Sequence, residues 1–106
     1  MIEYEDVILA IDEGTSGTRA AVVARNSQVH CLGYQPLQVS SQRHGVVEQD
    51  ADEILQATIA VCRAAIANAQ RSKMRIVALA IATQRSTAVL WDAGTGKALA
   101  PAMVWQ

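Results

Sequence analysis

The chain has 106 residues, an apolar fraction of 51% and a formal net charge of −1. This length allows one domain with a hydrophobic core, and the composition is typical of a globular protein rather than a disordered one. The near-neutral charge argues against a nucleic-acid-binding surface, and the apolar run at residues 7–11 is too short for a signal peptide or a membrane span.

The two cysteines and two histidines show no metal-binding pattern. Cys31 and Cys62 lie far apart without a CxxC motif, and His30 and His44 lack the spacing of metal ligands. Because both cysteines have apolar neighbours, we expect buried free thiols and a reducing, cytoplasmic location. The histidines are expected to have surface or structural roles.

The first half of the chain predicts a three-stranded antiparallel meander. The apolar run 7–11 predicts a buried strand, and residues 19–24 and 28–39 predict the second and third strands. Polar turn residues separate these segments. Residues 40–47 are polar and are expected to form a loop.

A helix is predicted to begin after Asp50. Asp50 and Glu53 have the spacing of a capping box, and the basic residues Arg71 and Lys73 suit the other end of the helix dipole. Apolar residues at helical spacing predict one core-facing stripe. Its expected members are Ile54, Leu55, Ile59, Cys62, Ile66 and Ala69.

Extended segments follow the helix. Residues 76–82 predict a strand parallel to the first, 87–91 a further strand, 92–97 a hairpin-type turn and 98–105 a last extended segment. The predicted order is therefore βββαββ(β), a mixed α/β domain. Within the turn, the GTGK at 94–97 is not a phosphate-binding P-loop, because the required glycine and Ser/Thr positions hold tryptophan and alanine.

The stretch AIDEGTSGTRAAVV, residues 10–23, places Asp12 at the carboxyl end of the first predicted strand. Ligands of open α/β sheets bind at such strand ends. Gly14 and Gly17 allow close backbone approach or a positive φ, the hydroxyls add donors, and Arg19 adds a fixed positive charge. Asp12 has the wrong sign for a phosphate unless a magnesium ion, Mg²⁺, lies between them. The pattern therefore indicates a loop for metal-bound nucleotide phosphates, although residue types alone also fit an ordinary hairpin in which Asp12 bonds its own turn.

A second polar stretch follows the strand at 76–82. Thr83, Gln84 and Arg85 come directly after its apolar run, again at a carboxyl strand end. If the two strands pair in parallel, both polar turns lie at one edge of the sheet. An exposed arginine without a function is the alternative for a lone Arg at this position.

Three blocks together resemble the FGGY carbohydrate kinases, in particular their glycerol kinase branch. They are AIDEGTSGTRAAVV, HGVVEQDADEI and ALAIATQRSTAVLWDAGTGKALAPAMVWQ, and the similarity extends from Val7 to Gln106. The first block alone is only moderately specific, since actin-like ATPases contain related loops. The three blocks in this order are specific.

The resemblance implies the ribonuclease H-like (actin-like ATPase) fold, with ATP and substrate bound between two lobes. Residues 1–106 would be the N-terminal part of the first lobe, and the end of the chain within the apolar PAMVWQ leads us to expect a piece of a longer protein. The implied activity is ATP-dependent phosphorylation of a polyol or sugar hydroxyl. The implied partners are that small molecule and the rest of the kinase chain, with no nucleic acid or membrane, and the full-length protein could form a homo-oligomer.

Site roles follow from the same resemblance, position by position. The metal position is Asp12, the nucleotide phosphates are lined by Thr15, Ser16, Gly17 and Arg19, and the substrate is contacted by Thr15, Arg85, Ser86 and Trp105. The catalytic base, usually an aspartate in this family, is expected from a later segment. Trp105 has an equally good alternative as a core or interface tryptophan.

Three positions depart from the glycerol kinase pattern. Gly17 and Thr18 stand where glycerol kinases often have two serines, and Gly17 loses a hydroxyl but keeps its backbone N–H. Ser86 stands where glycerol kinases have a glutamate that holds the polyol hydroxyls. A serine is a weaker partner than a carboxylate, so Ser86 indicates another polyol or a larger sugar rather than glycerol.

Two other functions use similar loops. An actin-like or Hsp70-like nucleotide switch would use the first loop without a small substrate, and the TQR block and Trp105 argue against it. A ribonuclease H-like nuclease needs several carboxylates, but residues 76–90 contain no Asp or Glu. The carbohydrate kinase is therefore the favoured hypothesis.

Overall fold

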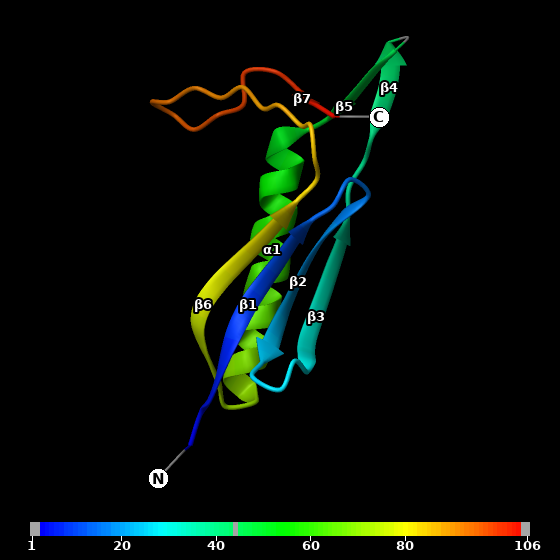
Figure 1. The fold of residues 1–106 in the computed structure, drawn as a ribbon. Coiled ribbons are helices and arrows are strands. Elements are labelled where there is room, and N and C mark those ends of the chain that lie inside the picture. Colours follow the sequence, from blue (N-terminus) through cyan, green and yellow to red (C-terminus); the bar gives the residue numbers. More distant parts are fainter. Residues whose placement is uncertain (1–2, 44, 105–106) are drawn as a thin grey trace.

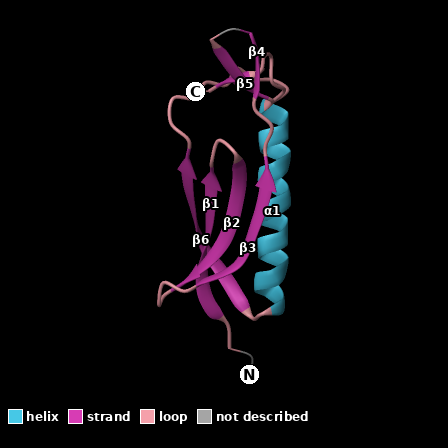
Figure 2. Ribbon diagram, turned by 90° about the vertical axis from the view of Figure 1, so that its right-hand side faces the viewer, coloured by secondary structure: helices cyan, strands magenta, loops and turns pink. Residues whose placement is uncertain are grey.

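A four-stranded sheet with one helix on one face forms the body of the chain (Figures 1 and 2). The computed structural model describes residues 3–43 and 45–104. The strand order is β3-β2-β1-β6, and only the β1–β6 pair is parallel. These elements are β1 (Glu5–Glu13), β2 (Gly17–Ala24), β3 (Val29–Pro36), α1 (Ala51–Arg71) and β6 (Met74–Thr83). The predicted meander and the parallel return strand are both confirmed.

A small second sheet lies beyond the amino-terminal end of α1 (Figure 1). It pairs β4 (Ser40–Arg43) with β5 (Val46–Gln49), and β5 with β7 (Ala102–Met103). The prediction of a polar loop at 40–47 is therefore wrong. Two short strands form here because backbone hydrogen bonds pair β5 with both β4 and β7, and β5 begins with two valines rather than with polar residues.

The predicted strand at 87–91 is also absent. Ala88 forms an isolated bridge with Met103, and Trp91 with Ala98, on an extended excursion of the chain. Of the predicted extended segment at 98–105, only β7 is a strand, and Trp105 lies outside the described residues. The turn at 92–97 is confirmed, because the Asp92 carboxylate accepts hydrogen bonds from the N–H groups of Gly94 and Thr95. Those bonds lower the pKa of Asp92.

The start of α1 follows the predicted capping signal. The Asp50 carboxylate accepts hydrogen bonds from the N–H groups of Asp52 and Glu53, at 2.9 and 3.3 Å. The Glu53 carboxylate accepts the N–H of Gln38 at 2.8 Å, so it links the helix to the segment after β3. The helix is thereby fixed both by its own cap and by the main sheet.

The side of α1 that meets the sheet agrees with the predicted stripe only in part: Ala69 is buried and Cys62 packs against the core, as predicted. The buried helix residues are Ala57, Val61, Ala65 and Ala69, whereas Leu55 is 52% exposed and Ile66 is also exposed. Small side chains at i, i+4 spacing let the helix approach the fully buried Ala20 and Val22 of β2. Hydrophobicity alone predicted the larger residues, but close approach required the smaller ones.

Cys62 is a partly buried free thiol rather than a fully buried one. Burial raises its pKa, and the negative charge of Glu13 raises it further. The thiol is therefore held in its unreactive protonated form. His30 is half-buried, whereas His44 and the side chain of Cys31 lie outside the part of the chain that the structure describes.

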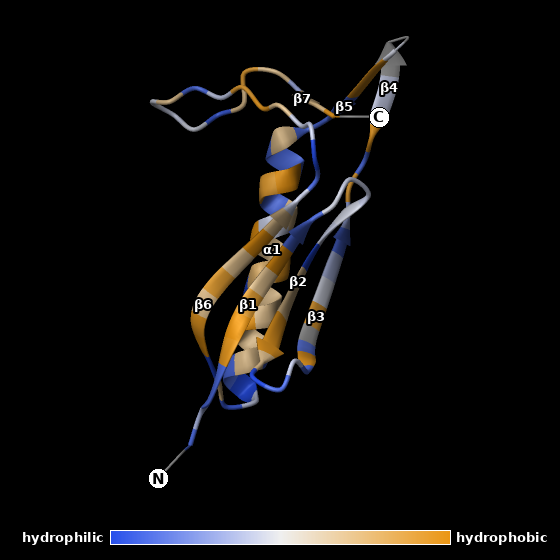
Figure 3. Ribbon diagram, viewed as in Figure 1, coloured by the Kyte–Doolittle hydropathy of each residue, from blue (hydrophilic) through white to orange (hydrophobic). Residues whose placement is uncertain are grey.

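β6 is one of the two edge strands of the sheet formed by the described residues, and it is poorly covered. Leu79 and Ile81 stand in register with the buried Leu9 and Ile11, yet they are 58% and 59% exposed. The reason is that α1 packs mainly over β2 and β3. Figure 3 shows the resulting apolar strand at one side of the sheet. No helix in residues 3–43 and 45–104 is both long and apolar enough to cross a membrane.

We expect Ala65→Leu to destabilise the protein by about 1–3 kcal/mol, because the added side chain overpacks the contact between α1 and β2. Ala64→Leu on the exposed side of the same helix is the matched control. Thermal unfolding followed by circular dichroism should show a lower Tm for the first variant only. Equal Tm values would contradict the close packing described here.

Candidate functional site

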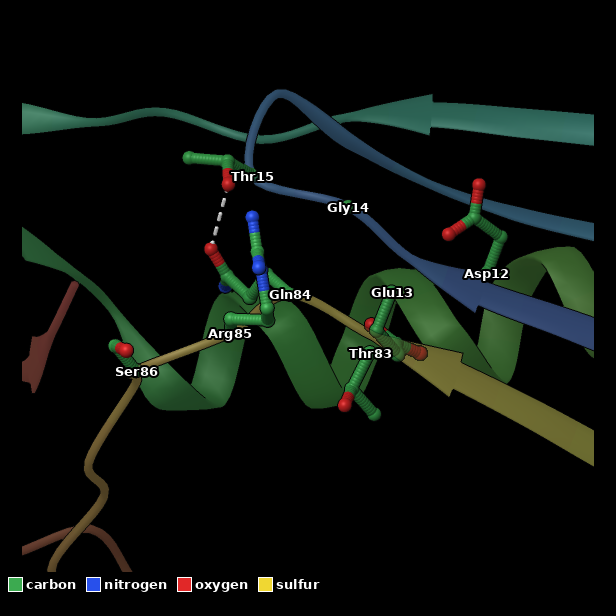
Figure 4. A pocket seen from close by; sticks show the side chains of 8 residues that line it. All are labelled: Asp12, Glu13, Gly14, Thr15, Thr83, Gln84, Arg85 and Ser86. Atoms are coloured by element: carbon green, nitrogen blue, oxygen red, sulfur yellow. Dashed lines mark hydrogen bonds between the residues drawn. The ribbon is translucent and has the colours of Figure 1, made fainter. Parts of the chain in front are cut away.

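The two polar turns singled out in the sequence meet at one edge of the sheet. β1 and β6 run parallel to their ends, where Glu13 is in register with Thr83. The N–H of Gln84 continues the pairing by donating to the Glu13 carbonyl at 2.7 Å. The turns enclose an open groove of about 420 Å³ (Figure 4). Its lining residues are Asp12, Glu13, Gly14, Thr15, Thr83, Gln84, Arg85 and Ser86.

The neighbouring carboxylates Asp12 and Glu13 have different surroundings, because successive side chains of a strand point to opposite faces. The Glu13 carboxylate accepts hydrogen bonds from the hydroxyls of Thr18 and Thr58, at 3.1 and 2.5 Å. It is thus held against α1. Asp12 is exposed and lies 3.7 Å from Arg19 across the β1–β2 pair. Asp12 is therefore the carboxylate that an incoming cation can reach.

Arg19 approaches this region from β2, outside the groove lining. Its guanidinium lies over the Tyr34 ring, 4.6 Å from the centroid. Its ion pair with Asp12 is weak, because the two side chains are 48% and 56% exposed. A bound anion or metal could rearrange such a pair at little cost.

The turn after β1 is closed by its own backbone. Gly14 N–H donates to the Gly17 carbonyl at 3.1 Å, which forms the predicted hairpin. A positive φ, one of the two expected reasons for glycine in this turn, is found at neither Gly14 nor Gly17. Gly17 is buried beneath Tyr34, whose ring occupies the space that a Cβ would need. The Tyr34 hydroxyl donates to the carbonyl of Ser16 at 3.1 Å.

A ring of hydrogen bonds joins the two turns through a third residue, Gln49. The Thr15 hydroxyl donates to Gln84 Oε1 at 2.7 Å, Gln84 Nε2 donates to Gln49 Oε1 at 3.0 Å, and Gln49 Nε2 donates to the Thr15 carbonyl at 2.7 Å. The first of these bonds is drawn in Figure 4. Gln49 is only 2% exposed. The sequence does not single it out, because a glutamine in a short polar segment carries no local signal.

The structure brings together four of the candidate site residues, Asp12, Thr15, Arg85 and Ser86. Arg85 and Ser86 are exposed, and Ser86 has a φ of 54°, an uncommon conformation for a residue other than glycine. Ser16, Gly17 and Arg19 do not line the groove. Trp105 lies outside the described residues.

The described residues contain no cluster of three or more His, Cys, Asp or Glu side chains able to hold a metal ion. A divalent cation at Asp12 would therefore need most of its ligands from a bound phosphate and from water. Mg²⁺ is bound in this way in many proteins, with one or two carboxylates. The donor set at Asp12 fits that ion.

Comparison with known proteins identifies the family. Residues 7–106 match the model of the FGGY family of carbohydrate kinases, N-terminal domain. The chain is 42% identical over 99 residues to the glycerol kinase of Acinetobacter baylyi. The aligned region makes up 93% of this chain but only 20% of that protein. It therefore spans about a fifth of the length of such relatives.

Solved structures agree with this assignment. A Plasmodium falciparum glycerol kinase with ADP superimposes on 99% of this chain and 21% of its own, with a TM-score of 0.91 and 25% identity. A xylulose kinase from Rhodospirillum rubrum covers 92% of this chain and 20% of its own, with a TM-score of 0.84 and 24% identity, and supports the fold. The expected mixed α/β, actin-like ATPase fold is confirmed. The chain belongs to the FGGY family of carbohydrate kinases, whose N-terminal domain it matches.

Proposed function

We propose that the complete protein containing this chain is an ATP-dependent kinase that phosphorylates a hydroxyl of a polyol or sugar. The observation that carries the proposal is the groove in which the turn of Asp12 and Thr15 faces Arg85 and Ser86. One side offers groups suited to metal-bound phosphates, and the other offers groups suited to hydroxyls. Membership of a carbohydrate kinase family and the ADP in the Plasmodium glycerol kinase support this division.

On the nucleotide side, Asp12 is the metal residue of the proposal, and Thr15, Ser16, Gly17 and Arg19 are its phosphate residues. Mg²⁺, when bound, would neutralise the phosphate charge that develops during transfer. Asp12 would hold the ion, and Arg19 lies 3.7 Å from Asp12, near enough to contact a phosphate oxygen. Ser16 and Gly17 would contribute through the backbone of the turn.

On the acceptor side, Thr15, Arg85 and Ser86 would contact the substrate, together with Trp105. The Arg85 guanidinium offers a planar set of donors for neighbouring hydroxyls. Ser86 offers a single hydroxyl, which is a weaker partner than a carboxylate. We therefore propose a polyol or sugar larger than glycerol as the acceptor. The catalytic base that removes the proton of the acceptor hydroxyl would come from outside these 106 residues. We propose that the protein acts in the cytoplasm.

The first measurement is ADP release by the complete protein with Mg-ATP and a panel of acceptors. The panel contains glycerol, erythritol, pentitols, ribulose and xylulose. Turnover on a four- or five-carbon acceptor but not on glycerol is the expected result, and the isolated 106-residue chain should show none. Efficient turnover on glycerol would refute the role given to Ser86. Nucleotide binding without turnover on any acceptor would favour a nucleotide-switch protein instead.

Asp12→Asn should lower kcat by about two orders of magnitude or more, because the neutral amide removes the charged metal ligand that this part of the protein supplies. The loss should be partly offset by raising the Mg²⁺ concentration. Steady-state kinetics over a magnesium series measures both effects. Asp6→Asn is the matched control, since Asp6 pairs with Arg75 at the far end of β1, and it should leave the kinetics unchanged.

Gly17→Ser should destabilise the protein by about 1–2 kcal/mol, although serine is common at this position in relatives of the glycerol kinase type. Its Cβ would displace the Tyr34 ring, which breaks the bond to the Ser16 carbonyl and the contact with Arg19. The KM for ATP should rise as the turn loosens.

A double-mutant cycle with Tyr34→Ala tests this cause, because Gly17→Ser should be nearly neutral once the ring is gone. An equal cost of Gly17→Ser in both backgrounds would show that Tyr34 is not the reason for the glycine.

A further inference from the structure

The hydrogen-bond ring of Thr15, Gln84 and Gln49 runs head to tail. Each glutamine side chain donates through Nε2 and accepts through Oε1, and Thr15 both donates its hydroxyl and offers its carbonyl. All three bonds lie between 2.7 and 3.0 Å. The three bonds form one chain through the two glutamine amides, so each amide is polarised by the bond on its other side, which strengthens the chain.

Gln49 is the member of the ring that rests on regular structure. Its backbone pairs with Ala102 in the small sheet, and the next residue, Asp50, caps α1. Thr15 and Gln84 instead lie in turns that follow β1 and β6. Gln49 therefore ties two turns to a helix start and a second sheet. It does not line the groove, so any effect on ligands must pass through its two partners.

We propose that Gln49 is a positioning residue that couples nucleotide binding to acceptor binding in this site. The inference rests on the proposed kinase function, in which Thr15 belongs to the phosphate turn and Gln84 precedes the acceptor residue Arg85. Gln49 bonds to both turns and reinforces the direct bond from the Thr15 hydroxyl to Gln84, so a ligand that fixes one turn also fixes the other. The second ligand then binds to turns that are already ordered and pays less of the ordering cost.

The test measures this coupling in the complete protein. Isothermal titration gives the Kd of Mg-ADP with and without a saturating acceptor, and the ratio of the two values is the coupling factor. The wild type should show a factor well above one. Gln49→Leu, which keeps the volume but removes both polar atoms, should bring the factor close to one and raise the KM of both substrates roughly tenfold.

Gln49→Glu gives a second test, the pH dependence of the coupling factor. A residue with only a structural role would not change this pH dependence. The ionised carboxylate keeps the acceptor for Gln84 but places an oxygen against the Thr15 carbonyl, so coupling should be lost at neutral pH. When protonated, it regains one donor and one acceptor. Burial raises the pKa of such a carboxyl group, so coupling should return as the pH is lowered through that pKa. Each value is divided by that of the wild type at the same pH, because the wild type carries the same other carboxylates, among them Glu13, Glu48 and Asp50.

Val61→Ala is the matched control, since Val61 is buried between α1 and the sheet, away from the groove. It should lower the Tm without changing the coupling factor. Gln49 variants that keep the wild-type factor, in a protein that forms ADP, would overturn the positioning role and leave the kinase proposal standing. A wild type that forms no ADP would instead overturn the proposed function, and the coupling proposal with it.

Discussion

β1 and β6 run parallel and in register up to Glu13 and Thr83, although the whole of α1 separates them in sequence. Parallel pairing places the carboxyl ends of both strands at the same edge of the sheet. Asp12 at the end of β1 and Thr15 in the turn after it therefore lie beside the turn that carries Arg85 and Ser86. The pair depends in turn on α1, which is anchored on β2 and returns the chain to the start of β6.

The elements that could be predicted are those that form because of their own local sequence. The apolar run in β1 and the Asp50 cap are local signals, and the structure follows both. The β4–β5 hairpin and the absence of a strand at 87–91 could not be predicted, because pairing with β7 and isolated bridges depends on distant segments. Ala69 was placed correctly on the core-facing side, but the rest of the helix stripe was misplaced, because close approach between α1 and β2, rather than hydrophobicity, selects Ala57 and Ala65.

The candidate site shows the same division. Asp12 and Arg85 could be placed at strand ends from local pattern, and parallel pairing then brought them to one groove. Gln49 could not be found in this way, since its importance comes from two partners in remote turns. Gly17 was recognised as a departure, but its physical reason is the Tyr34 ring of another strand rather than an unusual backbone angle.

The uncovered β6 strand exposes the chain to association with other copies during synthesis. An edge strand presents a row of backbone N–H and C=O groups, and here exposed leucine and isoleucine side chains accompany them. Such an edge can pair with the same edge of another molecule. As a nascent chain leaves the ribosome, β6 would stay open to self-association until later segments or a chaperone covered it. The strand that completes the groove is thus also an edge at which separate copies of this region can associate.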